Sequence, residues 1–417
     1  MDKKEKILLF ILAAVQFTVI VDFMIMMPLG PQLMRIFEIS PQQFGFLVSA
    51  YTFAAGISSF LGVFWVDLFD RKKVLFFSFA GLIIATLACA LSPTYSILML
   101  ARILTGIFGG IPGAVVFSII GDVFPENRRG TASGYVATSF SLASVLGVPF
   151  GLFLASLTNW HAPFYFLCLI GLVILFMIFK FVPNIKSHLK HKSIDSKIYD
   201  SFLHIIKNSN LRIALLFIAS LVLGQFTIVP FISPYMSANI GFTDAELTFI
   251  YLLGGAATII SSPYIGKLAD KFGKPKIFTV MGFLSIIPIV AVTNLPKVSI
   301  PIALIFTTMV FVFFSGRFVP ATAYITSVVS AKHRGAFMSF NFAFMQITSG
   351  VASLLAGMII TKSPDGTLLH YPYVGLIAVA FTFIAMFMIK KVKQVNEPEQ
   401  EIQIKKTTSS EEVILQD

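Results

Sequence analysis

The stretch GKLADKFGKPKIF (Gly266–Phe278) echoes an earlier stretch of the same chain, GVFWVDLFDRKKVL (Gly62–Leu75). A second pair of stretches matches in the same order, ENRRGTASGY (Glu126–Tyr135) and AKHRGAFMSF (Ala331–Phe340). In both halves a similar number of residues separates the aspartate of the first stretch from the Arg-Gly step of the second. Two matched pairs in the same order predict a chain built from two related halves.

Long apolar runs separate these basic stretches. The chain is 56% hydrophobic and 12% charged, whereas soluble domains carry about 25% charged residues, so an ordinary soluble enzyme is excluded. A bilayer crossing needs about 20 mostly apolar residues, and we predict twelve such segments. They lie near residues 7–34, 42–65, 74–91, 96–121, 131–157, 162–182, 211–236, 244–266, 276–294, 298–329, 335–361 and 372–390.

The predicted fold is an all-α integral membrane protein with two six-helix pseudo-repeats around a central cavity, the duplicated architecture of a secondary transporter. Residues 1–182 form the N-terminal bundle and residues 211–393 the C-terminal bundle. Between them, residues 183–210 form a cytoplasmic linker, whose partly amphipathic pattern favours a short helix at the membrane surface. Residues 394–417 are polar and are expected to form a disordered cytoplasmic tail.

The distribution of basic residues predicts the orientation. Of the 31 Lys and Arg residues, 26 fall in the segments that an N-terminus in the cytoplasm would place on the cytoplasmic side. The outward loops hold Arg35, Lys297 and Lys362, and the other two lie within spans. This asymmetry is the positive-inside pattern. We therefore expect a multi-pass protein of the cell (inner) membrane with both termini in the cytoplasm, and the formal charge of +11 needs no nucleic-acid partner to explain it.

The loop after the eighth span carries the motif Gly-x-x-x-Asp-(basic)-x-Gly-(basic), matched by Gly266, Asp270, Lys271, Gly273 and Lys274. In the first-half copy Asp67 matches, but Leu68 replaces the basic residue and Asp70 replaces the glycine. With this motif the chain resembles the major facilitator superfamily, and within it the twelve-helix drug and sugar efflux proteins of the drug:proton antiporter type. The resemblance covers the chain to about Lys393.

The resemblance implies a cytoplasmic gate. In this family the loop acid pairs with basic groups and a helix terminus and latches the cytoplasmic side. By this analogy Asp67 would act together with Arg71, Asp122 and either Arg128 or Arg129, and the second-half gate would use Gly266, Asp270 and Gly273. The alternative is that these residues are solvated loop charges.

The fourth span, which contains LARILTGIFGG, carries Arg102 and Gly106 of the family's intramembrane Arg-x-x-x-Gly motif, with Thr105 where glutamine is usual. Gly106 and Gly110 also form a face that allows close helix packing. A buried arginine needs a carboxylate or carbonyl partner. The resemblance implies a role for Arg102 in proton coupling, and the alternative is a structural arginine bonded to backbone carbonyls.

The fifth span, GYVATSFSLASVLGVPFG, keeps the glycines of the antiporter motif at Gly134, Gly147 and Gly151, with the proline shifted to Pro149. Glycine and proline at membrane depth predict a bent, closely packed helix. The resemblance implies a hinge or seal typical of exporters at Gly147, Pro149 and Gly151. Close packing alone would explain the same residues.

Within FTVIVDFMIMMPLGP (Phe17–Pro31), Asp22 lies inside a predicted span, where a charge costs about 2.5–3.5 kcal/mol on insertion scales. Thr18, Asp22 and Met26 share one helix face, so we expect a hydroxyl group beside the acid. A carboxyl group that gains and loses a proton within one cycle is what proton-coupled transport requires. Asp22 could equally attract a cationic substrate or form a permanent structural pair.

Four further polar residues in the predicted spans are candidates for proton coupling or substrate binding: Arg317, Gln225, Asn341 and Gln346. Counting from the cytoplasmic loops at about 1.5 Å per residue places Asp22 and Arg317 at similar depth. We therefore expect that the two could pair across the central cavity. For the three amides, hydrogen bonds between helices are the alternative to ligand contacts.

No catalytic motif accompanies these residues. All six histidines lie in or beside loops, and the sequence contains neither His-Glu-x-x-His, Gly-x-Ser-x-Gly nor a phosphate-binding loop. We expect no enzyme activity, metal or cofactor. The predicted function is proton-coupled efflux of a small amphipathic solute, drug-like or sugar-like, with proton-coupled uptake second and a non-transporting membrane sensor third. The expected partners are the solute, protons and lipid, and the family expectation is a monomer.

Overall fold

The computed structural model describes residues 2–186, 205, 207–329 and 331–394. The predicted tail therefore lies outside the described residues, apart from its first residue. Most of the linker, including the stretch in which a surface helix was expected, lies outside them as well.

Twelve helices of the described chain are long and apolar enough to cross a membrane, six before the linker and six after it, as predicted. The N-terminal half contains α1 (Lys3–Ile25), α2 (Gly30–Ile36), α3 (Pro41–Trp65), η1 (Val66–Leu68), α4 (Arg71–Ala90), α5 (Tyr95–Val123), α6 (Glu126–Leu142), η2 (Ala143–Gly147), α7 (Val148–Leu157) and α8 (Ala162–Phe181). The C-terminal half contains α10 (Ser209–Phe226), α11 (Val229–Tyr235), η4 (Met236–Ile240), α12 (Asp244–Phe272), α13 (Lys274–Thr293), α14 (Ile300–Ile325), α15 (Ala331–Ile359), β1 (Thr361–Lys362), β2 (Leu368–Leu369) and α16 (Tyr371–Ile389).

The first span of each half is broken near its end. The segment predicted as one span over 7–34 ends as a helix at Ile25, and the short helix α2 follows it. In the C-terminal half α10 ends at Phe226, and the short helix α11 follows. Proline explains both breaks, because Pro28 and Pro230 lack a backbone N–H and clash with a preceding turn. The matching breaks agree with a duplicated chain.

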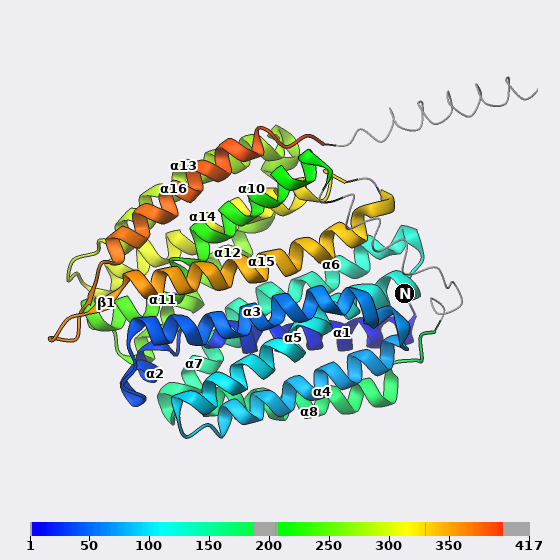
Figure 1. Cartoon of the computed structure of the whole chain (residues 1–417), viewed down its shortest axis with the longest axis horizontal. Coiled ribbons are helices and arrows are strands. Elements are labelled where there is room, and N and C mark those ends of the chain that lie inside the picture. The colour runs from blue at the N-terminus through cyan, green and yellow to red at the C-terminus, as the bar shows by residue number, and fades with distance from the viewer. Residues whose placement is uncertain (1, 187–204, 206, 330, 395–417) are drawn as a thin grey trace, which may run out of the picture.

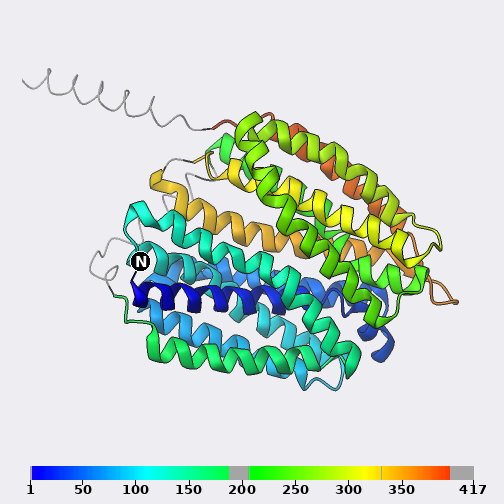
Figure 2. The same cartoon turned by 180° about the vertical axis from the view of Figure 1, so that it is seen from behind.

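The two ends of the bundle differ. Figures 1 and 2 show the N-terminus at one end and the antiparallel β1–β2 hairpin at the other. We call the first the basic end, since the loops at 71–73, 128–129 and 267–276 also lie there, and the second the opposite end.

Apolar packing joins the two halves most extensively at the opposite end. There one cluster of buried side chains contains residues of both halves, including Phe44 and Phe231. At the basic end two separate clusters form, one around Phe79 within the N-terminal half and one around Phe278 within the C-terminal half. Helix α3 packs along α15, and α7 packs on α12, so these two helix pairs connect the halves. Among the described residues, the shared apolar core therefore lies away from the basic end.

Candidate functional site

Three helices of the N-terminal half bring together a buried charged cluster around Asp22. The Arg102 Nη1 atom of α5 donates a hydrogen bond to Asp22 Oδ2 at 3.1 Å and to the Asp22 backbone oxygen at 3.3 Å. The Thr86 hydroxyl of α4 donates to Asp22 Oδ1 at 2.9 Å. Each of the three residues is only 1% exposed. The acid and the base thus compensate each other away from water, as a buried ion pair requires.

Tyr51 of α3 covers the guanidinium group of this pair. The Arg102 Cζ atom lies 4.6 Å from the centre of the Tyr51 ring, a cation–π contact. Glycines on α5 allow this approach, because a Cβ atom at Gly106 would lie 2.4 Å from the Tyr51 backbone oxygen. A Cβ atom at Gly110 would lie equally close to the Ala55 backbone oxygen. The predicted small-residue face therefore packs α5 against the backbone of α3.

The expected pairing of Asp22 with Arg317 is wrong in this structure. Arg317 instead donates from Nη1 to the Thr382 hydroxyl of α16 at 2.6 Å, and its Cζ atom lies 4.6 Å from the Phe314 ring centre. The reason is depth. Asp22 lies three residues before the end of α1 at Ile25, on the side of the opposite end, whereas Arg317 lies eight residues before α14 ends at Ile325, on the basic side. Counting depth back from the loop overlooked that α14 stops at Ile325.

A second expectation about Asp22 also fails. Thr18 is buried on the same helix, but its hydroxyl donates to the Ala14 backbone oxygen at 3.0 Å. The hydroxyl group that contacts the acid is that of Thr86, from another helix. Neither Thr86 nor Tyr51 was singled out from the sequence, because threonine and tyrosine in an apolar span carry no spacing signal. The available signal in the sequence was that a buried Arg102 needs polar partners.

Arg317 is buried with unused hydrogen-bonding capacity. It is 1% exposed, and its Nε and Nη2 atoms find no partner among the described residues. Such donors are costly to bury. Arg317 therefore differs from Arg102, whose charge a carboxylate compensates.

At the basic end, Arg71 connects two acids of the predicted gate. It pairs with Asp67 through Nη1 and with Asp122 through Nε at 3.1 Å. The two candidate arginines of the next loop have other partners in the described chain. Arg128 pairs with Glu5 at 3.0 Å, and Arg129 donates to the Phe124 backbone oxygen at the end of α5. The structure thus joins Asp67 and Asp122 through Arg71, while Arg128 and Arg129 bond to Glu5 and Phe124.

The two copies of the loop motif differ at the glycine position. Gly273 has φ +94°, so a side chain there would be strained, and it separates α12 from α13. At the corresponding place Asp70 has φ −57°, caps α4 through the Lys72 amide, and accepts a hydrogen bond from the Ile185 amide at 3.1 Å. Asp70 therefore anchors the segment that follows the sixth span, a role not predicted from the sequence. Asp270 is exposed and forms no ion pair with the described residues.

The regular α-helix of the fifth span is interrupted close to Gly147 and Pro149. A π-helical turn, η2, ends at Gly147 and is followed by α7 with Pro149 in its first turn. Both glycines also pack closely. A Cβ atom at Gly147 would lie 2.3 Å from Val21 Cγ2, and one at Gly151 would lie 2.7 Å from Ile25 Cδ1. The interruption and close packing therefore coexist against α1.

The hydrogen bonds described for the Asp22 cluster include none of the three amides. Asn341 is buried, donates to the Met345 sulfur at 3.5 Å on its own helix, and leaves Oδ1 without a partner in the described chain. Gln225 and Gln346 are half-buried, and their side chains form no hydrogen bonds with described residues. The expected bonds between helices are not seen. Within the part of the chain described, no three His, Cys, Asp or Glu residues group in a way that could hold a metal ion.

Curated relatives match this chain over more than half of its length. The uncharacterized MFS-type transporter YceJ of Bacillus subtilis (strain 168) is 24% identical, over 83% of this chain and 87% of its own. Multidrug resistance protein 2 of the same organism is 22% identical, over 94% and 97%. A probable sugar efflux transporter of Helicobacter pylori (strain ATCC 700392 / 26695) is 24% identical over 57% and 59%.

Solved structures share the fold. The crystal structure of a bacterial homologue of the human lysosomal transporter Spinster, inward-facing and unoccupied, superposes with a TM-score of 0.76 at 15% identity, over 95% of this chain and all of that one. The family model described as Major Facilitator Superfamily matches residues 12–229 and 214–415. The chain therefore belongs to the Major Facilitator Superfamily and is a multi-pass membrane transporter, not an enzyme.

Proposed function

We propose that this transporter exports small amphipathic solutes, drug-like or sugar-like, in exchange for protons. The direction is supported by relatives that are named for multidrug resistance and sugar efflux at 22–24% identity. The basic residues at the N-terminal end support a cytoplasmic location of both termini in the inner membrane.

The buried pair of Asp22 and Arg102 is the observation that carries the coupling proposal. Ionisable side chains within membrane spans are paired and mark functional sites such as proton relays, and Asp22 is enclosed with one guanidinium group and one hydroxyl group. When Asp22 binds a proton, Arg102 loses its counter-charge and keeps neutral contacts, among them the Tyr51 ring and the Asp22 backbone oxygen. An uncompensated buried charge is costly, so protonation would favour rearrangement of α1, α4 and α5.

The packing of the halves supports a cycle of alternating access. One apolar cluster joins both halves at the opposite end, while the clusters at the basic end belong to one half each. Shared buried packing at the opposite end is expected when the outer side is closed; the Phe60 and Phe340 rings of α3 and α15 also meet across the halves. In the proposed cycle, solute enters from the cytoplasm and a proton from outside returns through Asp22.

The remaining candidates have supporting roles in this proposal. Asp67, Arg71 and Asp122 would hold the cytoplasmic gate of the N-terminal half, with Gly266, Asp270 and Gly273 as its counterpart. Gly147, Pro149 and Gly151 would let the fifth span bend. For solute contact we propose Arg317, Gln225, Asn341 and Gln346. All four lie in the C-terminal half, and each has side-chain polar atoms without a hydrogen-bond partner among the described residues.

The test is retention of a solute panel by an efflux-deficient bacterial host. The panel contains lipophilic cations, neutral antibiotics and small sugars, and each is measured with and without an uncoupler. We expect the wild-type protein to lower retention of at least one solute, and Asp22→Asn and the uncoupler each to abolish that effect. Thr18→Val is the matched control. Thr18 lies one turn away on α1, but its hydroxyl donates to the Ala14 backbone oxygen of the same helix.

Other outcomes would contradict parts of this proposal. Unchanged export by Asp22→Asn would make the acid structural. Accumulation of the solute instead of its loss would establish proton-coupled uptake. Binding of a solute by purified protein without any flux would establish a sensor.

A further inference from the structure

An ion pair crosses from one half to the other at the opposite end. Arg35 lies in the last turn of α2, and its Nη2 atom is 2.6 Å from Asp244 Oδ2 in the first turn of α12. The other ion pairs among described residues all lie within the N-terminal half. Arg35 and Asp244 thus form the one described ion pair that must separate if the halves part at this end.

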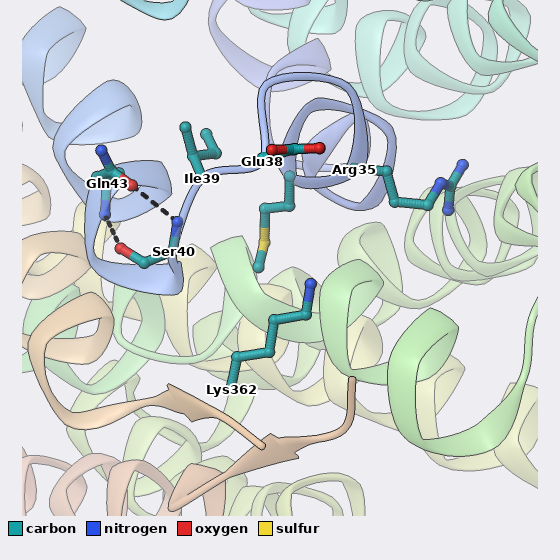
Figure 3. A pocket seen from close by; sticks show the side chains of 7 residues that line it. Arg35, Glu38, Ile39, Ser40, Gln43 and Lys362 are labelled. Carbon is teal, nitrogen blue, oxygen red and sulfur yellow. Dashed lines mark hydrogen bonds between the residues drawn. The ribbon is translucent and has the colours of Figure 1, made fainter. Parts of the chain in front are cut away.

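A pocket of about 500 Å³ lies beside this pair and is also shared by both halves. Its lining residues are Met34, Arg35, Glu38, Ile39, Ser40, Gln43 and Lys362. Figure 3 shows the Lys362 side chain extending from the β1 strand across the pocket toward the segment that carries Glu38. The N-terminal half therefore presents Arg35 and Glu38, and the C-terminal half presents Asp244 and Lys362. Each half thus supplies one positive and one negative charge here; Arg35 and Asp244 form an ion pair, and Glu38 and Lys362 line the same pocket.

The backbone holds Glu38 and Lys362, which line the same pocket, in place. Glu38 has φ +52°, a left-handed conformation in which glycine is usual after a helix. On the other side, the Asn239 side chain binds the β1–β2 hairpin. It donates to the Leu368 backbone oxygen and accepts from the Leu368 backbone N–H, each at 3.0 Å. Lys362 consequently moves with the C-terminal half, and Glu38 with the N-terminal half.

Aromatic side chains fill the seam behind these charges. The Phe44 and Phe231 rings meet edge to face across the two halves, with centroids 5.7 Å apart. The Phe23 and Phe226 rings also meet across the halves, tilted by 34° with centroids 6.0 Å apart. The charges stand at the surface and the apolar contacts lie within, the arrangement of a closed gate.

We propose that Arg35 and Asp244, supported by Glu38 and Lys362, form an outer latch that closes the transport path to the exterior. This inference rests on the alternating-access function proposed above. The two side chains are 54% and 29% exposed, so water and salt weaken their attraction. A weak latch suits a gate that must open in each cycle. The apolar seam contributes most of the closure, and the ion pair shifts the equilibrium between the closed and the open gate.

The test measures opening without any solute. Ser353→Cys serves as reporter, because Ser353 is fully buried and its backbone oxygen lies against Gly45 of the other half. A membrane-impermeant maleimide is applied to intact cells and, in parallel, to inverted vesicles. Wild-type protein gives the blank, since Cys89 and Cys168 are both buried. Asp365→Cys, in the exposed turn of the hairpin, identifies the accessible face, and the latch is assessed on that face.

We expect Arg35→Ala and Asp244→Ala each to speed labelling of the reporter about two- to fivefold, the range for losing an exposed ion pair. The exchanged pair Arg35→Asp with Asp244→Arg should slow labelling again. High salt should speed labelling of the intact latch but not of the single variants. Glu246→Gln is the matched control, since it removes a charge from the same turn of α12 while Glu246 bonds only within that turn.

Two results would overturn the latch. Either the single variants label no faster than Glu246→Gln, or the exchanged pair labels as fast as the single variants. Both readings are independent of solute transport, so a failure of the exporter proposal and a failure of the latch can be told apart. Labelling of Asp365→Cys only in inverted vesicles would place the ion pair on the cytoplasmic side and so overturn its assignment to the exterior.

Discussion

At the scale of single residues, the Asp22–Arg102 pair determines how the N-terminal half tolerates charge. Removing one partner leaves the other charge buried without compensation, which costs about 3–5 kcal/mol. We therefore expect Asp22→Asn and Arg102→Met each to lower the thermal stability of the purified protein clearly. The double variant should recover much of that loss, because replacing a buried pair by neutral groups is often nearly neutral. A double variant that loses the sum of both single losses would show that the residues act independently.

A smaller residue-scale effect is expected at Thr86. Thr86→Val removes the hydroxyl group that donates to Asp22 but keeps the shape of the side chain. The loss should be about 1 kcal/mol, the usual net value of one hydrogen bond, or somewhat more because the acceptor is charged. Thermal unfolding in detergent measures it. Thr18→Val provides the comparison, and an equal effect of both variants would deny Thr86 a special contact with the acid.

Sequence reasoning identified both charged members of this site but not their pairing. Asp22 and Arg102 are conspicuous because charges are rare in apolar spans. Their contact depends on where α1 ends, at Ile25, and where α5 begins, at Tyr95, and such helix ends follow from packing that hydropathy does not report. Thr86 and Tyr51 could not be predicted, since neither residue type is unusual in a span.

At the scale of elements, the glycines of α5 and α6 have different surroundings. Gly110→Val should destabilise the protein by about 1–3 kcal/mol, because the added carbons meet the α3 backbone. Gly134→Ala should be tolerated or stabilising by up to about 1 kcal/mol, since no described atom lies within 4 Å of the added carbon and alanine favours helix. Thermal stability of the two variants distinguishes them, and equal losses would contradict the described packing of α5.

The loop motif after the eighth span offers a backbone test. Gly273→Ala forces a side chain into a left-handed conformation at φ +94°, so it should cost about 1 kcal/mol or more. Gly266→Ala lies within α12, where the nearest described atom is 3.8 Å from the added carbon, and should cost nothing. Stability of the two single variants decides the point, and a larger loss at Gly266 would contradict it.

The presence of the membrane-spanning helices was predictable from the sequence, but the breaks within them were only partly predictable. Twelve spans follow from hydropathy and the interruption near Pro149 from composition. The breaks after α1 and α10 coincide with Pro28 and Pro230. Each proline lies in an apolar run long enough for one span, so hydropathy predicts an unbroken segment there. The turn at Asp70 departs from its glycine counterpart because Asp70 bonds to Ile185, a contact across more than 100 residues that no local pattern indicates.

At the scale of the whole molecule, the two halves have related helices but unequal chemistry. In the N-terminal half a buried carboxylate compensates the charge of Arg102, whereas Arg317 in the C-terminal half bonds to the Thr382 hydroxyl and pairs with no described carboxylate. This division suits a transporter in which one half responds to protons and the other contacts the solute. Repeats in the sequence predicted the shared architecture, while the difference in charge pairing emerges only when the helices are packed.

The central claim is that Asp22 carries the coupling proton, and gradient-driven transport in proteoliposomes tests it most directly. With a solute identified from the retention panel, an imposed pH gradient should drive its net movement through wild-type protein. Asp22→Asn should abolish that gradient-driven movement while solute exchange at equal pH on both sides persists, because the solute path is intact but the proton site is gone. Gradient-driven transport by Asp22→Asn at the wild-type rate would contradict the account.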